Sequence, residues 1–116
     1  MSWTLKVRDV FQAAHFLEEY KGKCENIHGH SFHVEVQIQV TELDPTGIGI
    51  DFKKIKNKLS EIMPDHTLLN DVYGFNPTAE NLSKQFFQEL KKDFPVKAVT
   101  VWESKDASAT YEESED

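Results

Sequence analysis

Residues 28–40, HGHSFHVEVQIQV, contain the most regular pattern in the chain. Between Phe32 and Val40 apolar and polar residues alternate, which is typical of a β-strand with one buried face. His28 and His30 occupy the same alternate positions as the apolar residues, so their side chains should point towards the protected side of the strand. The pattern therefore predicts a strand that carries two imidazoles on its inner face.

The other segments predict an α+β fold in which two strands, two helices and two further strands follow one another. The strands are expected at residues 3–15, 32–40, 96–103 and 107–111. A helix should begin at Phe52 and end at Pro64, and the segment 65–71 should be a short connection. Asn76 and Pro77 should form the N-cap and first position of the second helix. The apolar stripe of that helix consists of Ala79, Leu82, Phe86 and Leu90.

This arrangement makes an antiparallel four-stranded sheet with two helices on one face, and it leaves the other face uncovered. A chain of 116 residues is long enough for one domain, residues 1–116, and too short to close such a sheet into a barrel by itself. Self-association is therefore expected to bury the open face and the strand edges.

The composition is that of a soluble globular protein, with 39% hydrophobic and 28% charged residues. A formal net charge of −7 argues against nucleic acid as a partner, because a polyanion binder needs a basic surface. No apolar run approaches the roughly 18 residues of a membrane helix, and no signal-peptide pattern is recognisable. A single cysteine cannot form an intrachain disulfide, so a reducing, cytoplasmic location is expected.

Metal binding is the chemistry that His28 and His30 favour. Zn²⁺ binds imidazole nitrogen at about 2.0–2.1 Å and prefers tetrahedral coordination. His15, near the end of the neighbouring strand, is the best candidate for a third ligand, whereas His33 has the opposite parity and should lie on the surface. Cys24 is either a fourth ligand, which would close a structural site, or a reactive thiol beside an open catalytic position.

Three further features have both a functional and an ordinary interpretation. Asp65 and His66 could form an acid/base pair, although turn residues after a helix end explain the dipeptide more simply. Glu103 continues the inward positions of its strand and is either a ligand anchor or an exposed strand end. Glu80 suits the first turn of a helix because of the helix dipole, and a role in ligand binding would be additional.

In combination these residues resemble the 6-pyruvoyl-tetrahydropterin synthase family, in particular its 6-carboxytetrahydropterin synthase branch of queuosine biosynthesis. The resemblance extends through nearly the whole chain and implies the tunnelling fold. In that fold the four-stranded sheets of several subunits join into a β-barrel, commonly in a homohexamer made of two trimers. The matching motifs are Ala13-Ala14-His15, Cys24-x3-His28-Gly29-His30, Ile50-Asp51-Phe52, Asp65-His66-x2-Leu69-Asn70, Asn76-Pro77-Thr78-Ala79-Glu80 and Glu103.

The resemblance also implies a substrate, 7,8-dihydroneopterin triphosphate, which would yield 6-carboxy-5,6,7,8-tetrahydropterin, acetaldehyde and triphosphate. The resemblance implies that His15, His28 and His30 bind Zn²⁺ and leave one coordination position open. It implies that Cys24 is a proton-transferring thiolate and that Asp65 and His66 are a second acid/base pair. Glu103 would anchor the pterin, and Thr78 and Glu80 would line the pocket. Some of these residues would act across a subunit interface. Lys21 and Lys23 could meet the triphosphate, although a solvated loop explains them equally well.

Two details of spacing concern the branch of the family. The three residues between Cys24 and His28 resemble the bacterial queuosine enzymes, whereas the biopterin-forming 6-pyruvoyl-tetrahydropterin synthases typically have a longer spacer. Glu25, however, creates Glu-x2-His-Gly-His, which resembles a branch that makes 6-hydroxymethyl-7,8-dihydropterin for folate with a glutamate in place of the thiol. A folate-directed or dual activity therefore stays open, as does 6-pyruvoyl-tetrahydropterin synthase activity, and a non-catalytic zinc-binding oligomer is the non-enzyme hypothesis.

Overall fold

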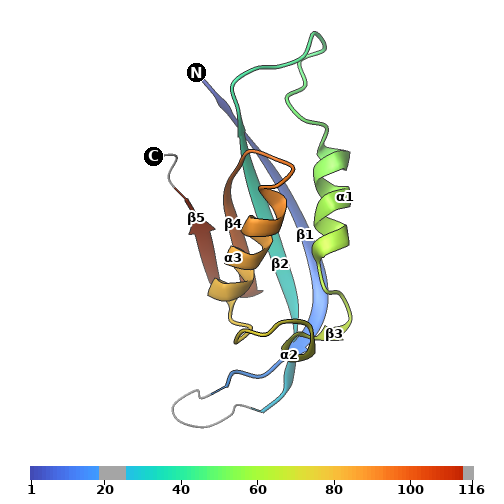
Figure 1. Cartoon of the computed structure of the whole chain (residues 1–116), viewed down its shortest axis with the longest axis vertical. Coiled ribbons are helices and arrows are strands. Elements are labelled where there is room, and N and C mark those ends of the chain that lie inside the picture. Colours follow the sequence, from blue (N-terminus) through green and yellow to red (C-terminus); the bar gives the residue numbers. More distant parts are fainter. Residues whose placement is uncertain (19–25, 114–116) are drawn as a thin grey trace.

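The structure, a computed structural model, describes residues 1–18 and 26–113 as one sheet with helices packed against it. The strands are β1 (Trp3–His15), β2 (His28–Val40), β3 (Thr67–Leu68), β4 (Val96–Ser104) and β5 (Ala107–Glu112), and the helices are α1 (Phe52–Ile62), α2 (Leu69–Val72) and α3 (Ala79–Leu90). The strand order is β3-β1-β2-β4-β5, and only the pair of β1 and β3 is parallel. The two long helices α1 and α3 lie on the same side of the sheet (Figure 1).

The α+β class is confirmed, but the predicted count of four strands and two helices is wrong by two short elements. Both lie in the segment that was expected to be a connection. Thr67 and Leu68 form β3, which pairs with Ala13 and Ala14 of β1, and α2 follows directly as one turn. Elements of two and four residues are too short to show a strand or helix period, so the sequence pattern could not reveal them.

Each long helix begins at a capping side chain. The carboxylate of Asp51 caps α1, and the hydroxyl of Thr78 caps α3 by accepting a hydrogen bond from the amide of Asn81 at 3.1 Å. The predicted N-cap at Asn76 is therefore wrong by two residues, because its side chain bonds the backbone of Glu18 instead. None of the helices in residues 1–18 and 26–113 has the length and apolar character that a membrane span requires.

The core lies between the helices and one face of the sheet, as the strand alternation predicts. Along β2, every second residue from Phe32 to Ile38 is fully buried, and the apolar stripe of α3 is buried as well. Phe11 of β1 stacks on Phe32 with ring centroids 5.1 Å apart, and the edge of Phe86 meets it at 5.9 Å. This packing fixes which face of β1 and β2 looks towards the helices, and it thereby sets the direction of the histidines farther along both strands.

Candidate metal centre

Three histidines meet at the end of the sheet where β1 stops and β2 begins. His15 lies directly opposite His28, and His30 lies opposite Ala13. The ring centroid of His15 is 4.7 Å from that of His28 and 5.1 Å from that of His30, and the last two are 4.5 Å apart. One ligand nitrogen from each ring lies within 4.8 Å of the other two, so the three can bind one metal ion after small rotations of the rings.

Backbone carbonyls hold two of these rings in a fixed orientation. Nδ1 of His15 lies 2.8 Å from the carbonyl oxygen of Pro77, and Nδ1 of His28 lies 2.9 Å from that of Asn26. A carbonyl can only accept, so Nδ1 of each ring must donate and the lone pair of the neutral imidazole is on Nε2. This is the usual second contact of a histidine that binds a metal, because it fixes both the tautomer and the ring direction.

The surroundings of His15 need a cation. Its ring is completely buried, and no hydrogen-bond donor among the described residues reaches Nε2. The nearest charged group is Oε1 of Glu103, at 3.4 Å. A lone pair and a carboxylate at this distance repel each other unless His15 takes up a second proton or a cation lies beside them. The residues present therefore fit a bound metal ion.

Glu103 reaches this site from the end of β4, in the inward direction that its position in the strand predicts. Its side chain is one-third exposed, so one part of the carboxylate faces the buried imidazole and another part is open to solvent. The rings of His15 and His30 also contact Phe32, at centroid distances of 5.3 Å and 5.4 Å. The site thus combines an apolar floor with a carboxylate at its rim.

Asp65 and His66 lie beside the same end of β1. One carboxylate oxygen of Asp65 accepts a hydrogen bond from the amide of Gln12 at 2.8 Å, and the other lies 2.9 Å from Nδ1 of His66. The Gln12 amide, and after it His66, hold the pKa of Asp65 below its usual value of 3.8. Asp65 is therefore ionised at neutral pH and orients the imidazole of His66.

The backbone of His66 is unusual. Its φ angle of 58° lies in the left-handed region, which costs a residue with a side chain roughly 1–2 kcal/mol. Its amide donates to the carbonyl of Gln12, which ties this conformation to β1. His66 and His30 line the same cavity of about 430 Å³, together with Gly29 and Ser31. The structure thus places His66 beside this cavity, at the same end of β1 and β2 as the triad.

Thr78 and Glu80 occupy the start of α3, next to the carbonyl that orients His15. Thr78 is partly buried and has a structural role as N-cap. Glu80 is exposed in the first turn, where its charge suits the helix dipole. Their expected role as lining residues stays a prediction.

Four residues singled out from the sequence lie outside the described residues: Lys21, Lys23, Cys24 and Glu25. The described chain stops at Glu18 and resumes at Asn26, whose carbonyl orients His28. The segment that contains the thiol therefore starts and ends close to the triad in sequence. The choice between Cys24 as ligand and Cys24 as proton carrier stays a prediction.

Two asparagines of the motifs have roles that the sequence did not predict. The amide of Asn70 both accepts from the backbone nitrogen and donates to the carbonyl oxygen of Phe16, at 3.0 Å each. Asn76 makes the same two contacts with Glu18, at 2.9 Å and 3.4 Å. Each side chain thus imitates a strand partner and guides the chain as it leaves His15. Their place in the motifs was the only signal.

The fold and the histidine site together define an α+β protein with three histidines at one end that could bind a metal ion. A profile of the family described as 6-pyruvoyl tetrahydropterin synthase matches residues 4–114. The chain belongs to this family.

Individual relatives agree with this assignment. A protein of Archaeoglobus fulgidus named putative 6-carboxy-5,6,7,8-tetrahydropterin synthase is 39% identical over 99 residues, which cover 83% of this chain and 84% of the relative. The 6-carboxy-5,6,7,8-tetrahydropterin synthase of Synechocystis is 34% identical, over 78% and 76% of the two chains. The solved structure of Caenorhabditis elegans 6-pyruvoyl tetrahydropterin synthase is 30% identical in sequence and has a TM-score of 0.84. The superposition covers 98% of this chain and 97% of the Caenorhabditis elegans chain.

Proposed function

We propose that this chain is a zinc-dependent lyase of queuosine biosynthesis. It would convert 7,8-dihydroneopterin triphosphate and water to 6-carboxy-5,6,7,8-tetrahydropterin, acetaldehyde and triphosphate. The observation that carries the proposal is the convergence of His15, His28 and His30, two of them oriented by carbonyls, in a member of a pterin-synthase family. The names of the Archaeoglobus and Synechocystis relatives support the carboxypterin product.

The three imidazoles supply the donor set that suits Zn²⁺, with a fourth position for substrate. When bound, the ion would polarise the side-chain hydroxyls of the substrate and make their protons easier to remove. The carbonyls of Pro77 and Asn26 keep the rings of His15 and His28 directed at that point.

The proton transfers belong to residues of the chain itself. Cys24, as a thiolate, would exchange a proton with one side of the substrate side chain, and His66 would do so with the other. Asp65 fixes the ring of His66 through the 2.9 Å contact. Glu103 would anchor the pterin by accepting hydrogen bonds from its amino group and ring NH.

Self-association and location complete the proposal. The free edges of β1 and β5 favour assembly of several copies through their sheets into a β-barrel, as a homohexamer of two trimers. The enzyme would act in the cytoplasm, where a single cysteine stays reduced.

The test is to incubate the purified, zinc-loaded protein with 7,8-dihydroneopterin triphosphate and to identify the products by mass spectrometry. Carboxytetrahydropterin with one acetaldehyde per turnover is the expected result. A zinc-loaded oligomer that leaves the substrate unchanged would contradict the proposal and favour a purely structural zinc protein.

The Glu-x2-His-Gly-His pattern favours one second candidate, formation of 6-hydroxymethyl-7,8-dihydropterin for folate with Glu25 as the acid/base group. Cys24→Ala and Glu25→Ala form a matched pair that separates the two. The carboxypterin reaction should stop in Cys24→Ala and continue in Glu25→Ala, with zinc retained in both. Loss of zinc in Cys24→Ala would make the thiol a ligand.

A further inference from the structure

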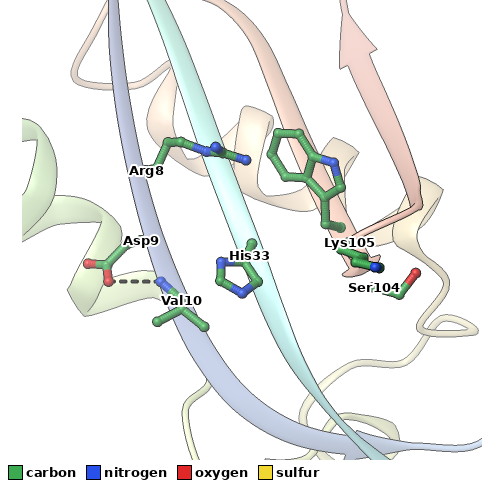
Figure 2. Close-up of a pocket in the computed structure, with 7 residues that line it drawn as sticks. Arg8, Asp9, Val10, His33, Ser104 and Lys105 are labelled. Carbon is green, nitrogen blue, oxygen red and sulfur yellow. Dashed lines mark hydrogen bonds between the residues drawn. The ribbon is translucent and has the colours of Figure 1, made fainter.

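A cavity of about 510 Å³ opens on the helix-free face of the sheet (Figure 2). Arg8 of β1, His33 of β2 and Trp102 of β4 line it from three adjacent strands, with Ser104 and Lys105 beside them. The neighbours of His33 along β2, Phe32 and Val34, are fully buried on the other face. Because the triad shares that other face, this cavity and the candidate metal centre lie on opposite sides of the sheet.

The basic groups of the cavity keep hydrogen-bond donors available. The guanidinium carbon of Arg8 lies 4.3 Å from the centre of the Trp102 ring, and Nε lies 3.6 Å from Oε1 of Glu35. These two contacts hold the planar group in place. Among the described residues, no acceptor takes a hydrogen bond from the terminal nitrogens of Arg8 or from Lys105.

The carboxylates close to the cavity do not occupy these donors. Glu35 faces Nε of Arg8, and Asp9 accepts a hydrogen bond from the amide of Val10 at 2.8 Å. Figure 2 shows the carboxylate of Asp9 on the other side of β1 from His33. Asp106 is exposed, and its backbone amide donates a hydrogen bond to the hydroxyl oxygen of Ser104. The hydroxyl proton of Ser104 can therefore be donated to a ligand. The net charge of −7 of the whole chain repels anions, so anion binding at this cavity would come from the local donors of Arg8, Lys105 and Ser104.

We propose that this cavity is a second ligand site, which binds a multiply charged phosphate anion. The guanidinium fork of Arg8 matches two phosphate oxygens, and the ammonium of Lys105 supplies a second positive charge. The volume is in the range of small-molecule sites, so it accommodates a chain of phosphoryl groups. The site does not depend on the proposed reaction, because none of its side chains belongs to the triad or to the acid/base pair.

The first experiment is a calorimetric titration of metal-free protein with inorganic triphosphate and with inorganic phosphate at constant ionic strength. Metal-free protein is used because triphosphate itself binds zinc. Saturable binding of one triphosphate per chain is expected, at least about tenfold tighter than phosphate because more oxygens are engaged. A wild-type protein that shows no saturable heat, or equal affinity for both anions, would overturn the proposal.

Matched variants locate the site. Arg8→Gln and Lys105→Gln should each weaken triphosphate binding about tenfold, whereas Lys56→Gln on the exposed face of α1 should change it less than about twofold. Equal losses in all three would indicate general attraction to positive charge and contradict a built site. Thermal unfolding of each variant shows whether the fold is retained, and Lys105 is exposed, so its variant tests the site without touching the core.

Fluorescence gives an independent readout, because the chain has two tryptophans and Trp3 lies at the far end of β1. In a Trp3→Phe background the emission comes from Trp102, which stacks with Arg8. Triphosphate should change this emission with the same saturation curve as the heat. Binding heat with unchanged Trp102 emission would place the anion elsewhere and overturn the assignment.

Discussion

His15 and His28 each use Nδ1 to bond a backbone carbonyl, one before α3 and one at the start of β2. A buried histidine that served only packing would need a donor for its remaining nitrogen, and the described residues offer none to Nε2 of His15. At the level of single residues, the case for a metal therefore rests on hydrogen-bond accounting as well as on proximity.

Replacement of one triad histidine should abolish metal binding. We expect His28→Ala to lower the zinc content from about one ion per chain towards zero, because two imidazoles bind zinc far more weakly than three. Elemental analysis after dialysis measures this. His33→Ala is the matched control, since His33 is exposed on the other face of the same strand and should leave the zinc content unchanged.

Glu103 tests the difference between a pterin anchor and a metal ligand. We expect Glu103→Gln to keep its zinc and to weaken pterin binding about tenfold or more, because a charged acceptor is replaced by a neutral amide. Equilibrium binding of a pterin and zinc analysis of the same sample give both quantities. The carboxylate lies only 3.4 Å from His15, so loss of zinc in this variant would instead make Glu103 a ligand.

The sequence predicted the triad because a two-residue period fixes which side of a strand each residue faces, and the direction of Glu103 followed from the same rule. The carbonyls of Pro77 and Asn26 could not be predicted in this way, because backbone groups carry no sequence signal. The surroundings of His66 depend on a left-handed backbone and on Gln12, which is distant from it in the sequence. Such long-range contacts are invisible to local patterns.

At the level of elements, the start of α3 connects the fold to the candidate site. Thr78 directly follows Pro77, and its hydroxyl caps the first turn of the helix. We expect Thr78→Ala to lower the free energy of unfolding by about 1 kcal/mol, which is the usual loss for a threonine N-cap. Urea denaturation measures it, and Thr78→Ser, which keeps the hydroxyl, should lose only a small part.

This pair of variants also separates the two roles given to Thr78. If Thr78→Ala weakens pterin binding while the free energy of unfolding stays unchanged, the residue acts as a lining residue and the cap contributes little.

The link between β1 and the turn after α1 should depend on pH. The pKa of Asp65 in the folded protein is below its usual value of 3.8, chiefly because of the Gln12 amide. A lowered folded-state pKa stabilises the protein above the pKa of the unfolded chain, and this stabilisation is lost as the pH falls through the folded value. We therefore expect wild type to melt at a higher temperature than Asp65→Asn at pH 7, and the difference to shrink as the pH falls below 3.8. A constant difference would contradict the role of the charge.

Long elements were predicted well and short ones were not. β1, β2, α1 and α3 have enough residues to repeat their period several times, and the burial of the α3 stripe confirms the assignment. β3 and α2 form because the chain after α1 returns to the edge of β1, which is a tertiary effect. The N-cap at Thr78 was missed because Asn76 is an equally good capping residue by type. In the structure the side chain of Asn76 bonds the backbone of Glu18 and does not cap the helix.

At the scale of the whole molecule, the sheet ends in free edges and one open face. β3 covers only Ala13 and Ala14 of the outer edge of β1, and β5 forms the opposite edge. We expect native mass spectrometry of the purified protein to show six chains, since joined sheets would satisfy both edges. A monomer at micromolar concentration would contradict this expectation.

His15 and His28 form the last residue pair of the β1–β2 ladder before the segment that connects the two strands. The end of a ladder ordinarily frays first, because only one side of it is supported. An ion bound by both rings would link the two strands at this pair, as a crosslink does, and would reduce the entropic cost of closing the loop between them. The terminus of the two longest strands would then exchange its amide protons slowly, at Ala14 and Gly29 above all, and chelation would release it.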